Sequence, residues 1–323
     1  MKIIKASYIW SDQDFKHSLI SRIIESYFDV QFVWTTPAKC DLLFIGPYRP
    51  YKKIKEKFLN SHNKIIKNFL NDLERGLFFR KHKPLTIFHT SENERVFDLP
   101  EDFKIGTDYN YSYDESYLRI PVWKDRIDWS HLKLLTATTS NMNAKRFGGY
   151  YNLSDLMSPQ GSSFLKKNTR ICCFFSHLLE PRKSLIKQIK KSFNIDGYGK
   201  AFDAKIKNHN SSSFIKKEIL KNYFANFCPE NSLYPGYYTE KVPDAFISKS
   251  LPITWADQNI KNEFNPNAFI NLNDFDNIQI TNFLEEIKDK DYLLKFTKEP
   301  LLLTQPNLDN EINFAYKIVK NFI

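Results

Sequence analysis

The sequence is poor in cysteine and contains no long apolar segment. It has four cysteines in 323 residues, none in a C-x-x-C pair, and two of them lie inside an apolar, strand-like run. This usage excludes a disulfide framework and predicts reduced core thiols in a cytoplasmic protein. Charged residues interrupt every hydrophobic run before it reaches the roughly 18 residues of a transmembrane helix. We therefore expect a cytoplasmic protein that touches the inner membrane at most peripherally.

The motifs of several common enzyme classes are also missing. The chain has no Walker loop, no G-x-G-x-x-G, no G-x-S-x-G and no H-E-x-x-H. Three D-x-D strings, whose carboxylates suit Mg²⁺ or Mn²⁺, are present at Asp12/Asp14, Asp274/Asp276 and Asp289/Asp291. The last two stand at predicted helix starts, and so short a pattern often arises by chance. We expect no metal site and no required cofactor, with a non-essential Mg²⁺ or Mn²⁺ left open.

Basic residues are in excess, with 47 Lys and Arg against 37 Asp and Glu, which gives a net charge of +10. Such an excess suits nucleic acid, an anionic membrane surface or an anionic substrate. The lysines are spread along helical segments and do not cluster with aromatic residues, so the sequence disfavours a nucleic-acid partner. We therefore expect most of these lysines to lie on solvated helix faces, and the oligomeric state is left open.

Strand-like and helical segments alternate along the chain, which predicts an α/β fold with parallel sheets covered on both faces. The predicted strands of the first half are 3–10, 30–34, 41–45 and 85–89, with helices at 15–28 and 52–75. The second half has predicted strands at 170–176, 223–228, 251–255 and 268–272, and helices from 181, at 213–221, 275–287 and 311–322. The length suits two domains, which we place at 1–163 and 164–323. We expect the last helix to pack back on the first domain.

The stretch from residue 226 to 255 organises the second half. Its loop leads through Gly236 to Thr239, which can cap a helix that begins with Glu240 and Lys241. Pro243 is tolerated only near a helix start, so Glu240 and Lys241 must lie in the first turn. A helix N-terminus that carries a lysine is suited to an anionic phosphate. The alternative is an ordinary connection with a solvent-facing Glu-Lys pair.

Read whole, this stretch resembles the family 10 fucosyltransferases, the α1,3/α1,4 enzymes. The resemblance rests on Glu230-Asn231, on Gly236-Tyr237-x-Thr239-Glu240-Lys241, on the helix with Asp244 and on the L-P-I-x-W strand that ends at Trp255. It implies a GT-B fold, in which two Rossmann-like domains face each other across a cleft. The missing membrane anchor resembles the bacterial cytosolic type. The first domain would bind the acceptor, and the second would bind the nucleotide-sugar donor.

The resemblance also implies a catalytic base. Thr90-Ser91-Glu92 follows the strand 85–89 and matches a T-x-E run of the family, so Glu92 is the candidate general base. Open α/β sheets place functional groups at this end of their strands. The alternative is that Thr90 or Ser91 caps a short helix, with Glu92 favourably near its start.

Further residues follow from the same resemblance. Arg182 matches an arginine that contacts the nucleotide diphosphate, and Ser176 also matches the family pattern, whereas His177 replaces an asparagine. The implied donor-binding residues are Ser176, Arg182, Glu230, Asn231, Tyr237, Glu240 and Lys241. A second set, His177, Asp196, Gly197 and Gly199, either contacts the donor or shapes its loops. Phe224 replaces the usual lysine of a Y-K-F segment.

These assignments predict an inverting glycosyltransferase that acts in glycan or lipopolysaccharide biosynthesis. It would move L-fucose from GDP-fucose to a hydroxyl of an N-acetylglucosamine or glucose unit, in α1,3 or α1,4 linkage. Glu92 would activate the acceptor, and Arg182 and Lys241 would stabilise the GDP leaving group. Trp34, Trp123 and Trp129 are candidates for stacking on sugars, although such a tryptophan is more often a core residue. The alternatives are an enzyme of this fold with another GDP-deoxy or amino sugar, and a non-catalytic basic binding protein.

Overall fold

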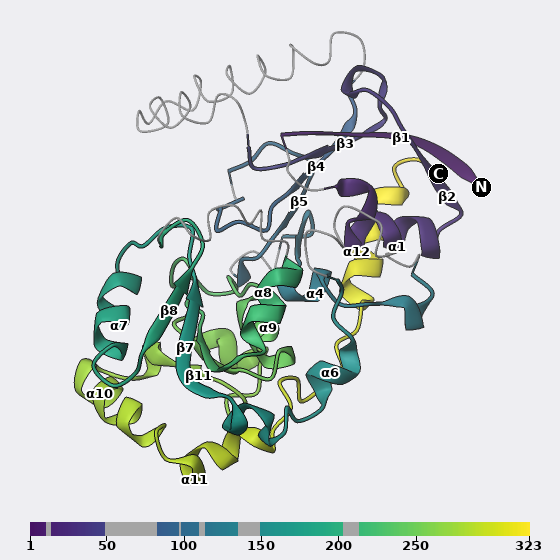
Figure 1. Cartoon of the computed structure of the whole chain (residues 1–323). Helices are drawn as coiled ribbons and strands as arrows, with labels where there is room; N and C mark the ends of the chain where they lie inside the picture. Colours follow the sequence, from purple (N-terminus) through teal and green to yellow (C-terminus); the bar gives the residue numbers. More distant parts are fainter. Residues whose placement is uncertain (11–13, 49–82, 97, 110–113, 135–148, 203–212) are drawn as a thin grey trace, which may run out of the picture. The chain divides into compact units, whose positions relative to one another are not determined.

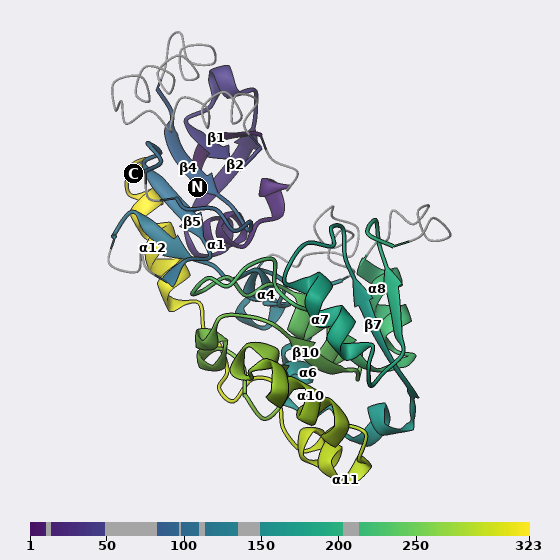
Figure 2. The ribbon, with the colours of Figure 1, turned by 90° about the vertical axis from the view of Figure 1, so that its left-hand side faces the viewer.

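The computed structural model describes residues 1–10, 14–48, 83–96, 98–109, 114–134, 149–202 and 213–323. The chain divides into two units (Figures 1 and 2). Unit 1 comprises residues 1–120, 129–136 and 308–323, and unit 2 comprises residues 121–128 and 137–307. By these contacts the described residues 149–163 group with unit 2, on the other side of the predicted division at residue 163, and residues 308–323 group with unit 1, where the last helix was expected to pack. The reason is that the chain crosses between the units several times.

Unit 1 is built on a parallel sheet with the strand order β2-β1-β3-β4-β5-β6. The strands are β1 (Lys2–Ile9), β2 (Val30–Trp34), β3 (Leu42–Ile45), β4 (Leu85–His89), β5 (Phe103–Gly106) and β6 (Tyr117–Arg119). The four strands predicted for this half are confirmed, with ends that shift by one residue at most. β3 is buried along its whole length, as expected for a parallel strand covered on both faces.

Two helices that are far apart in the sequence pack together in unit 1. α1 (Leu19–Tyr27) begins at Ser18, whose hydroxyl accepts a hydrogen bond from the Ser21 amide. It lies beside α12 (Asp309–Val319) in both views of the ribbon. The predicted helix 52–75 lies outside the described residues.

Unit 2 contains a second parallel sheet, with the order β11-β10-β9-β7-β8. Its strands are β7 (Asn168–Phe174), β8 (Ile195–Tyr198), β9 (Tyr223–Phe227), β10 (Leu251–Thr254) and β11 (Ile270–Asn271). Its helices are α4 (Val122–Asp125), α6 (Leu153–Met157), α7 (Arg182–Ile189), α8 (Ser213–Leu220), α9 (Lys241–Ile247), α10 (Asn277–Glu286) and α11 (Lys290–Leu293). Figure 1 shows α7 on one side of β7 and β8, and α8 and α9 on the other. The strands predicted for this half are confirmed, although β11 is shorter than predicted.

Buried aromatic residues fill the interior of both units. Trp123 and Trp129 are 5% and 0% exposed, so the alternative that they are core residues is confirmed and neither stacks on a sugar. Phe224, at the position of the missing lysine, packs its ring on Phe193 in the core of unit 2. All four cysteines are free and buried, as predicted. In the described part of the chain, every helix is too short or too polar to cross a membrane.

Candidate active site

The loops that leave β7, β8 and β9 border a cavity of about 550 Å³ in unit 2, called the β7–β9 cavity below. It lies at the carboxyl ends of parallel strands, where open α/β sheets bind their ligands. The lining residues come from the ends of β7 and β9, from the β7–α7 loop, from Gly199 after β8, from α8, from the β9–α9 loop and from the start of α9. Seven sequence-predicted residues line it: Ser176, His177, Arg182, Gly199, Asn231, Glu240 and Lys241.

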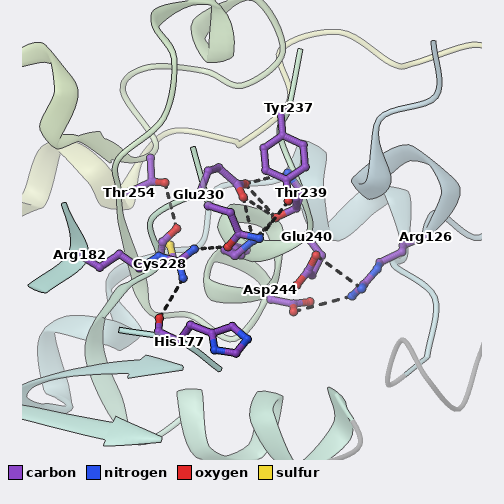
Figure 3. Close-up of polar contacts among 12 residues, drawn as sticks. Arg126, His177, Arg182, Cys228, Glu230, Tyr237, Thr239, Glu240, Asp244 and Thr254 are labelled. Carbon is purple, nitrogen blue, oxygen red and sulfur yellow. Dashed lines mark hydrogen bonds and ion pairs between the residues drawn. The ribbon is translucent and has the colours of Figure 1, made fainter. Parts of the chain in front are cut away.

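Arg182, the first residue of α7, is held by neutral groups. Its guanidinium donates one hydrogen bond to the His177 carbonyl at 3.3 Å and another to the side-chain oxygen of Asn231. The guanidinium carbon lies 5.0 Å from the centre of the Phe175 ring, a cation–π contact. Burial lowers the pKa of Arg182, although Glu230 and Tyr237 partly offset the effect. The side chain therefore presents a positive charge to the β7–β9 cavity from a fixed position (Figure 3).

Lys241, at the start of α9, is held by an ion pair. Its ammonium lies 2.8 Å from a carboxylate oxygen of Glu230 and 2.7 Å from the Thr239 hydroxyl. Glu230 is 1% exposed and also accepts hydrogen bonds from the amide and hydroxyl of Thr239, both at 2.8 Å. Burial opposes the charge of Lys241, but Glu230 and Glu240 outweigh it and raise its pKa. Thr239 was predicted to cap α9. The structure corrects this, because its hydroxyl is engaged with Glu230 and Glu240 occupies the N-cap position.

Glu240 belongs to a second group of buried charges. A guanidinium nitrogen of Arg126 lies 3.6 Å from one oxygen of Glu240, and the Lys216 ammonium lies 3.9 Å from the other. Asp244, one turn further along α9 and 0% exposed, pairs with Lys216 at 2.8 Å and accepts a hydrogen bond from Tyr151 at 2.8 Å. Burial raises the pKa of Glu240, but Arg126, Lys241 and Lys216 more than offset this effect and lower it overall. Glu240 is thus an ionised hydrogen-bond acceptor at neutral pH.

Arg126, Tyr151 and Lys216 were missed by sequence reasoning. Lys216 was read as one of the solvated lysines of the predicted helix 213–221, yet it lines the β7–β9 cavity. Arg126 and Tyr151 come from segments far from α9 in the sequence. A parallel β-bridge between Ile127, the residue after Arg126, and Tyr151 brings these two segments together. A local sequence motif cannot predict such a contact, because the partners come together only in the folded chain.

Four other predicted residues do not line the cavity. Glu230 and Tyr237 lie behind it, where Tyr237 accepts a hydrogen bond from the Asn231 amide at 3.2 Å and Glu230 holds Lys241. Asp196 pairs with Arg170 and accepts a hydrogen bond from Tyr223 at 2.9 Å, so its contacts are structural. Gly197 is required by packing, because a Cβ there would lie 2.2 Å from the Phe202 ring.

Gly199 satisfies two separate constraints. Its φ is +94°, and a Cβ at this position would lie 2.5 Å from the carbonyl oxygen of Phe175. Both features favour glycine, because other residues rarely adopt this backbone conformation. Gly199 and Phe175 both line the β7–β9 cavity, so this close approach shapes its wall.

Glu92 lies in unit 1, just after β4. Its amide donates a hydrogen bond to the Thr90 hydroxyl at 3.0 Å, and its carboxylate lies 3.4 Å from the Tyr48 hydroxyl, which donates to it. Residues 90–96 and 98–100, the described neighbours of Glu92, form no helix, so the alternative that Thr90 or Ser91 caps one is wrong. The carboxylate is partly exposed at the carboxyl end of the sheet, a suitable place for a general base.

Two of the D-x-D strings serve as helix caps. Asp276 accepts hydrogen bonds from the amides of Ile278 and Gln279 at 2.8 Å and begins α10. Asp289 accepts one from the amide of Asp291 at 2.9 Å and begins α11. Asp12 lies outside the described residues. Within the described ranges, no group of three or more His, Cys, Asp and Glu side chains is arranged to hold a metal ion.

Comparisons with known proteins match the region that contains the cavity and the fold of the chain. Residues 164–298, which contain the β7–β9 cavity, match the family model "Glycosyltransferase family 10 (fucosyltransferase) C-term". Over 295 residues the chain is 24% identical to the alpha-(1,3)-fucosyltransferase FucT of Helicobacter pylori, covering 86% of this chain and 55% of that protein. Over 164 residues it is 26% identical to 4-galactosyl-N-acetylglucosaminide 3-alpha-L-fucosyltransferase 9 of Mus musculus, covering 46% and 44%. The chain thus spans about half the length of these curated relatives.

A solved structure extends the comparison to the whole chain. The crystal structure of an alpha1,3-fucosyltransferase with GDP-fucose superposes with a TM-score of 0.66 at 20% identity and covers 100% of this chain and 92% of that one. At this identity the match concerns the fold. It confirms the predicted α/β fold of the GT-B type, with one parallel sheet in each unit.

Proposed function

We propose that this chain is a fucosyltransferase of glycosyltransferase family 10, whose model residues 164–298 match, and that it transfers L-fucose from GDP-fucose to a hydroxyl group of an acceptor glycan and inverts the anomeric centre. One observation carries the proposal. Arg182, Glu240 and Lys241 come from two separate loops and line one cavity within the residues that match the family model. That cavity has the size of a small-ligand site, and its lining includes two cations and a carboxylate that can accept hydrogen bonds.

The cations suit the leaving group. Cleavage of the bond between the sugar and the diphosphate builds negative charge on the phosphate, which fixed positive groups stabilise. Arg182 can bind two phosphate oxygens at once with its planar guanidinium, whereas Lys241 acts as a point charge. Because Asn231 and Glu230 hold these side chains, little reorganisation is required when the charge develops. We propose that no metal is required, with Mg²⁺ or Mn²⁺ at most an accessory.

The ionised Glu240 can accept hydrogen bonds from hydroxyl groups of the donor, on its sugar or its ribose. Asn231 and Ser176 supply further polar groups at the rim of the β7–β9 cavity. Glu92 takes the proton of the attacking acceptor hydroxyl, which requires its carboxylate to come within hydrogen-bond reach of that oxygen. The proposed acceptor is an N-acetylglucosamine or glucose unit of a surface oligosaccharide, linked α1,3 or α1,4, and we place the reaction in the cytoplasm.

A donor panel tests the proposal. Thermal-shift titration with GDP, GDP-fucose, GDP-mannose and UDP-sugars should show stabilisation by GDP and GDP-fucose. Ligand at about 100 times its Kd should add about 2.7 kcal/mol to the free energy of unfolding. Stabilisation by another GDP-sugar in preference to GDP-fucose would establish the alternative donor. Failure of every nucleotide to stabilise the protein would refute the assignment of the site.

Glu92→Gln tests the catalytic base separately. The substitution keeps the size of the side chain but removes its basicity, so we expect transfer to fall by about 10²- to 10⁴-fold. GDP binding should be unchanged, because Glu92 lies in the other unit. Initial rates of transfer and calorimetric titration with GDP measure the two effects. Normal turnover in this variant would remove Glu92 from the mechanism.

A further inference from the structure

Arg126 belongs to a short segment of the chain that forms part of unit 2. Residues 121–128 belong to unit 2, although the chain belongs to unit 1 immediately before and after them. Arg126 follows α4, is 8% exposed and directs its guanidinium at two carboxylates of α9. In Figure 3 it approaches Glu240 and Asp244 from the side opposite to Arg182. A buried arginine in this position requires an explanation, because burial of a charge is costly unless it is paired.

We propose that Arg126 is a positioning residue that fixes the carboxylate of Glu240 for its contact with the hydroxyl groups of the donor. The proposal rests on the proposed function. Arg126 itself is not among the residues that line the β7–β9 cavity, whereas Glu240 is. Any effect of Arg126 on the donor must therefore pass through a neighbour.

The geometry identifies that neighbour. One guanidinium nitrogen of Arg126 lies 3.6 Å from an oxygen of Glu240, and the other lies 4.0 Å from Asp244. Asp244 is already engaged by Lys216 and by the Tyr151 hydroxyl, each at 2.8 Å. Glu240 has a more distant second cation, with Lys216 at 3.9 Å. Loss of Arg126 should therefore leave Asp244 in place and release Glu240.

The charge state of Glu240 supports the same role. Its carboxylate side chain is 22% exposed, so one part faces the β7–β9 cavity while the other faces Arg126 and Lys216. A carboxylate held in this way can only accept hydrogen bonds, and it selects ligand groups that donate them. Hydroxyl groups of a sugar or ribose are such donors. The guanidinium of Arg126 attracts one oxygen of the Glu240 carboxylate. This attraction also sets the direction in which the remaining lone pairs of the carboxylate point.

Two variants of Arg126 test the proposal. In Arg126→Gln, the KM for GDP-fucose in the transfer reaction should rise about tenfold, or kcat should fall by a similar factor. Arg126→Lys should recover part of the loss, because it keeps the charge but cannot reach both carboxylates. Arg170→Gln is the matched control, since it removes an arginine–carboxylate pair of unit 2 that does not touch the β7–β9 cavity. It should leave transfer within about twofold of the wild-type rate.

A double-mutant cycle separates positioning from a merely structural role. If Arg126 acts through Glu240, Arg126→Gln should cost less than about twofold in a Glu240→Gln background. In an Asp244→Asn background it should still cost about tenfold. The proposal is overturned if the tenfold loss persists without Glu240 or disappears without Asp244. Arg126→Lys enters the same cycle if Arg126→Gln does not fold.

The two hypotheses fail in different ways. If the wild-type protein binds no GDP-sugar, the proposed function fails before any variant is made. If the wild-type protein transfers fucose but the losses at Arg126 and Glu240 multiply, the proposed function stands and the positioning role is wrong. Thermal unfolding of each variant without ligand shows whether a loss of activity reflects a loss of folded protein.

Discussion

The two loops that border the β7–β9 cavity hold their cations in different ways. Arg182, which follows the β7–α7 loop, has two neutral partners, the backbone carbonyl of His177 and the side-chain oxygen of Asn231. The β9–α9 loop places Lys241 against the buried carboxylate of Glu230. Burial lowers the pKa of Arg182, whereas Glu230 and Glu240 raise the pKa of Lys241 against the effect of burial. Both residues are cations in one cavity, but only Lys241 has a carboxylate partner within the described part of the chain.

This difference separates ligand binding from stability. A cation without an ion-pair partner gains most when an anion arrives, so Arg182 should contribute mainly to binding of the diphosphate. A cation that neutralises a buried carboxylate is needed even when the site is empty. Lys241 should therefore contribute to both binding and folding, and mutation of Lys241 alone cannot isolate its role toward the ligand.

Lys241→Ala should give the largest effect. It leaves the carboxylate of Glu230 buried and unpaired, and such a loss costs about 3–5 kcal/mol of the free energy of unfolding. GDP affinity should fall as well, because one positive charge is lost from the β7–β9 cavity. Urea unfolding and calorimetric titration measure the two effects.

The double variant Glu230→Gln with Lys241→Met is the control for this prediction. It removes both charges together and should recover most of the lost stability, while GDP binding remains weak. An unchanged free energy of unfolding in Lys241→Ala would show that the ion pair does not support the fold, and the contrast with Arg182 would disappear.

Arg182→Ala should weaken GDP binding with little effect on stability. Loss of a hydrogen bond to a charged group costs about 1.5–3 kcal/mol, which corresponds to about a 10- to 150-fold rise in Kd. Arg182→Lys should be intermediate, because an ammonium cannot bind two oxygens in the guanidinium geometry. Calorimetry with GDP checks the affinity, and the melting temperature without ligand checks the fold. A large fall in that melting temperature would place Arg182 in the same class as Lys241.

Alkaline pH should reveal the contribution of the Lys241–Glu230 ion pair to stability. The folded-state pKa of Lys241 lies above its ordinary value of 10.5, so its contribution to stability is fully present below that pH. It is lost as the pH rises through the folded-state pKa. The free energy of unfolding should therefore fall less above about pH 10.5 in the Glu230→Gln, Lys241→Met variant than in the wild type. Equal slopes in urea unfolding at alkaline pH would contradict the role of the ion pair.

Cys228 should show the smallest effect. It lines the β7–β9 cavity, but burial raises the pKa of its thiol to about 12. The thiolate is the reactive form, so iodoacetamide at pH 8 should modify Cys228 much more slowly than a free thiol of ordinary pKa. Mass spectrometry after timed alkylation measures the rate, and bound GDP should lower it further. Rapid alkylation that GDP does not affect would show that this wall of the cavity opens without ligand.

Periodicity and local motifs predicted the fold and the centre of the site. The strands of both sheets follow short apolar runs, and Arg182 and Lys241 stand at helix starts, where the sequence placed them. Thr239 shows the limit of this reasoning. Its position suits a helix cap, but the buried carboxylate of Glu230 offers its hydroxyl and amide a stronger partner. The contact with Glu230 in the folded chain therefore outweighs the local preference of threonine for the N-cap of a helix.

The sequence by itself determined the parallel α/β fold and the two loops that carry the cations, because both follow from the order of neighbouring residues. Only the tertiary structure decided which charges pair. Arg126, Lys216 and Tyr151 reach α9 from three separate segments, and electrostatic attraction at a few ångströms depends on distance in space alone. The state of Glu240 is therefore a property of the folded unit, although its place in the chain marked it as a candidate.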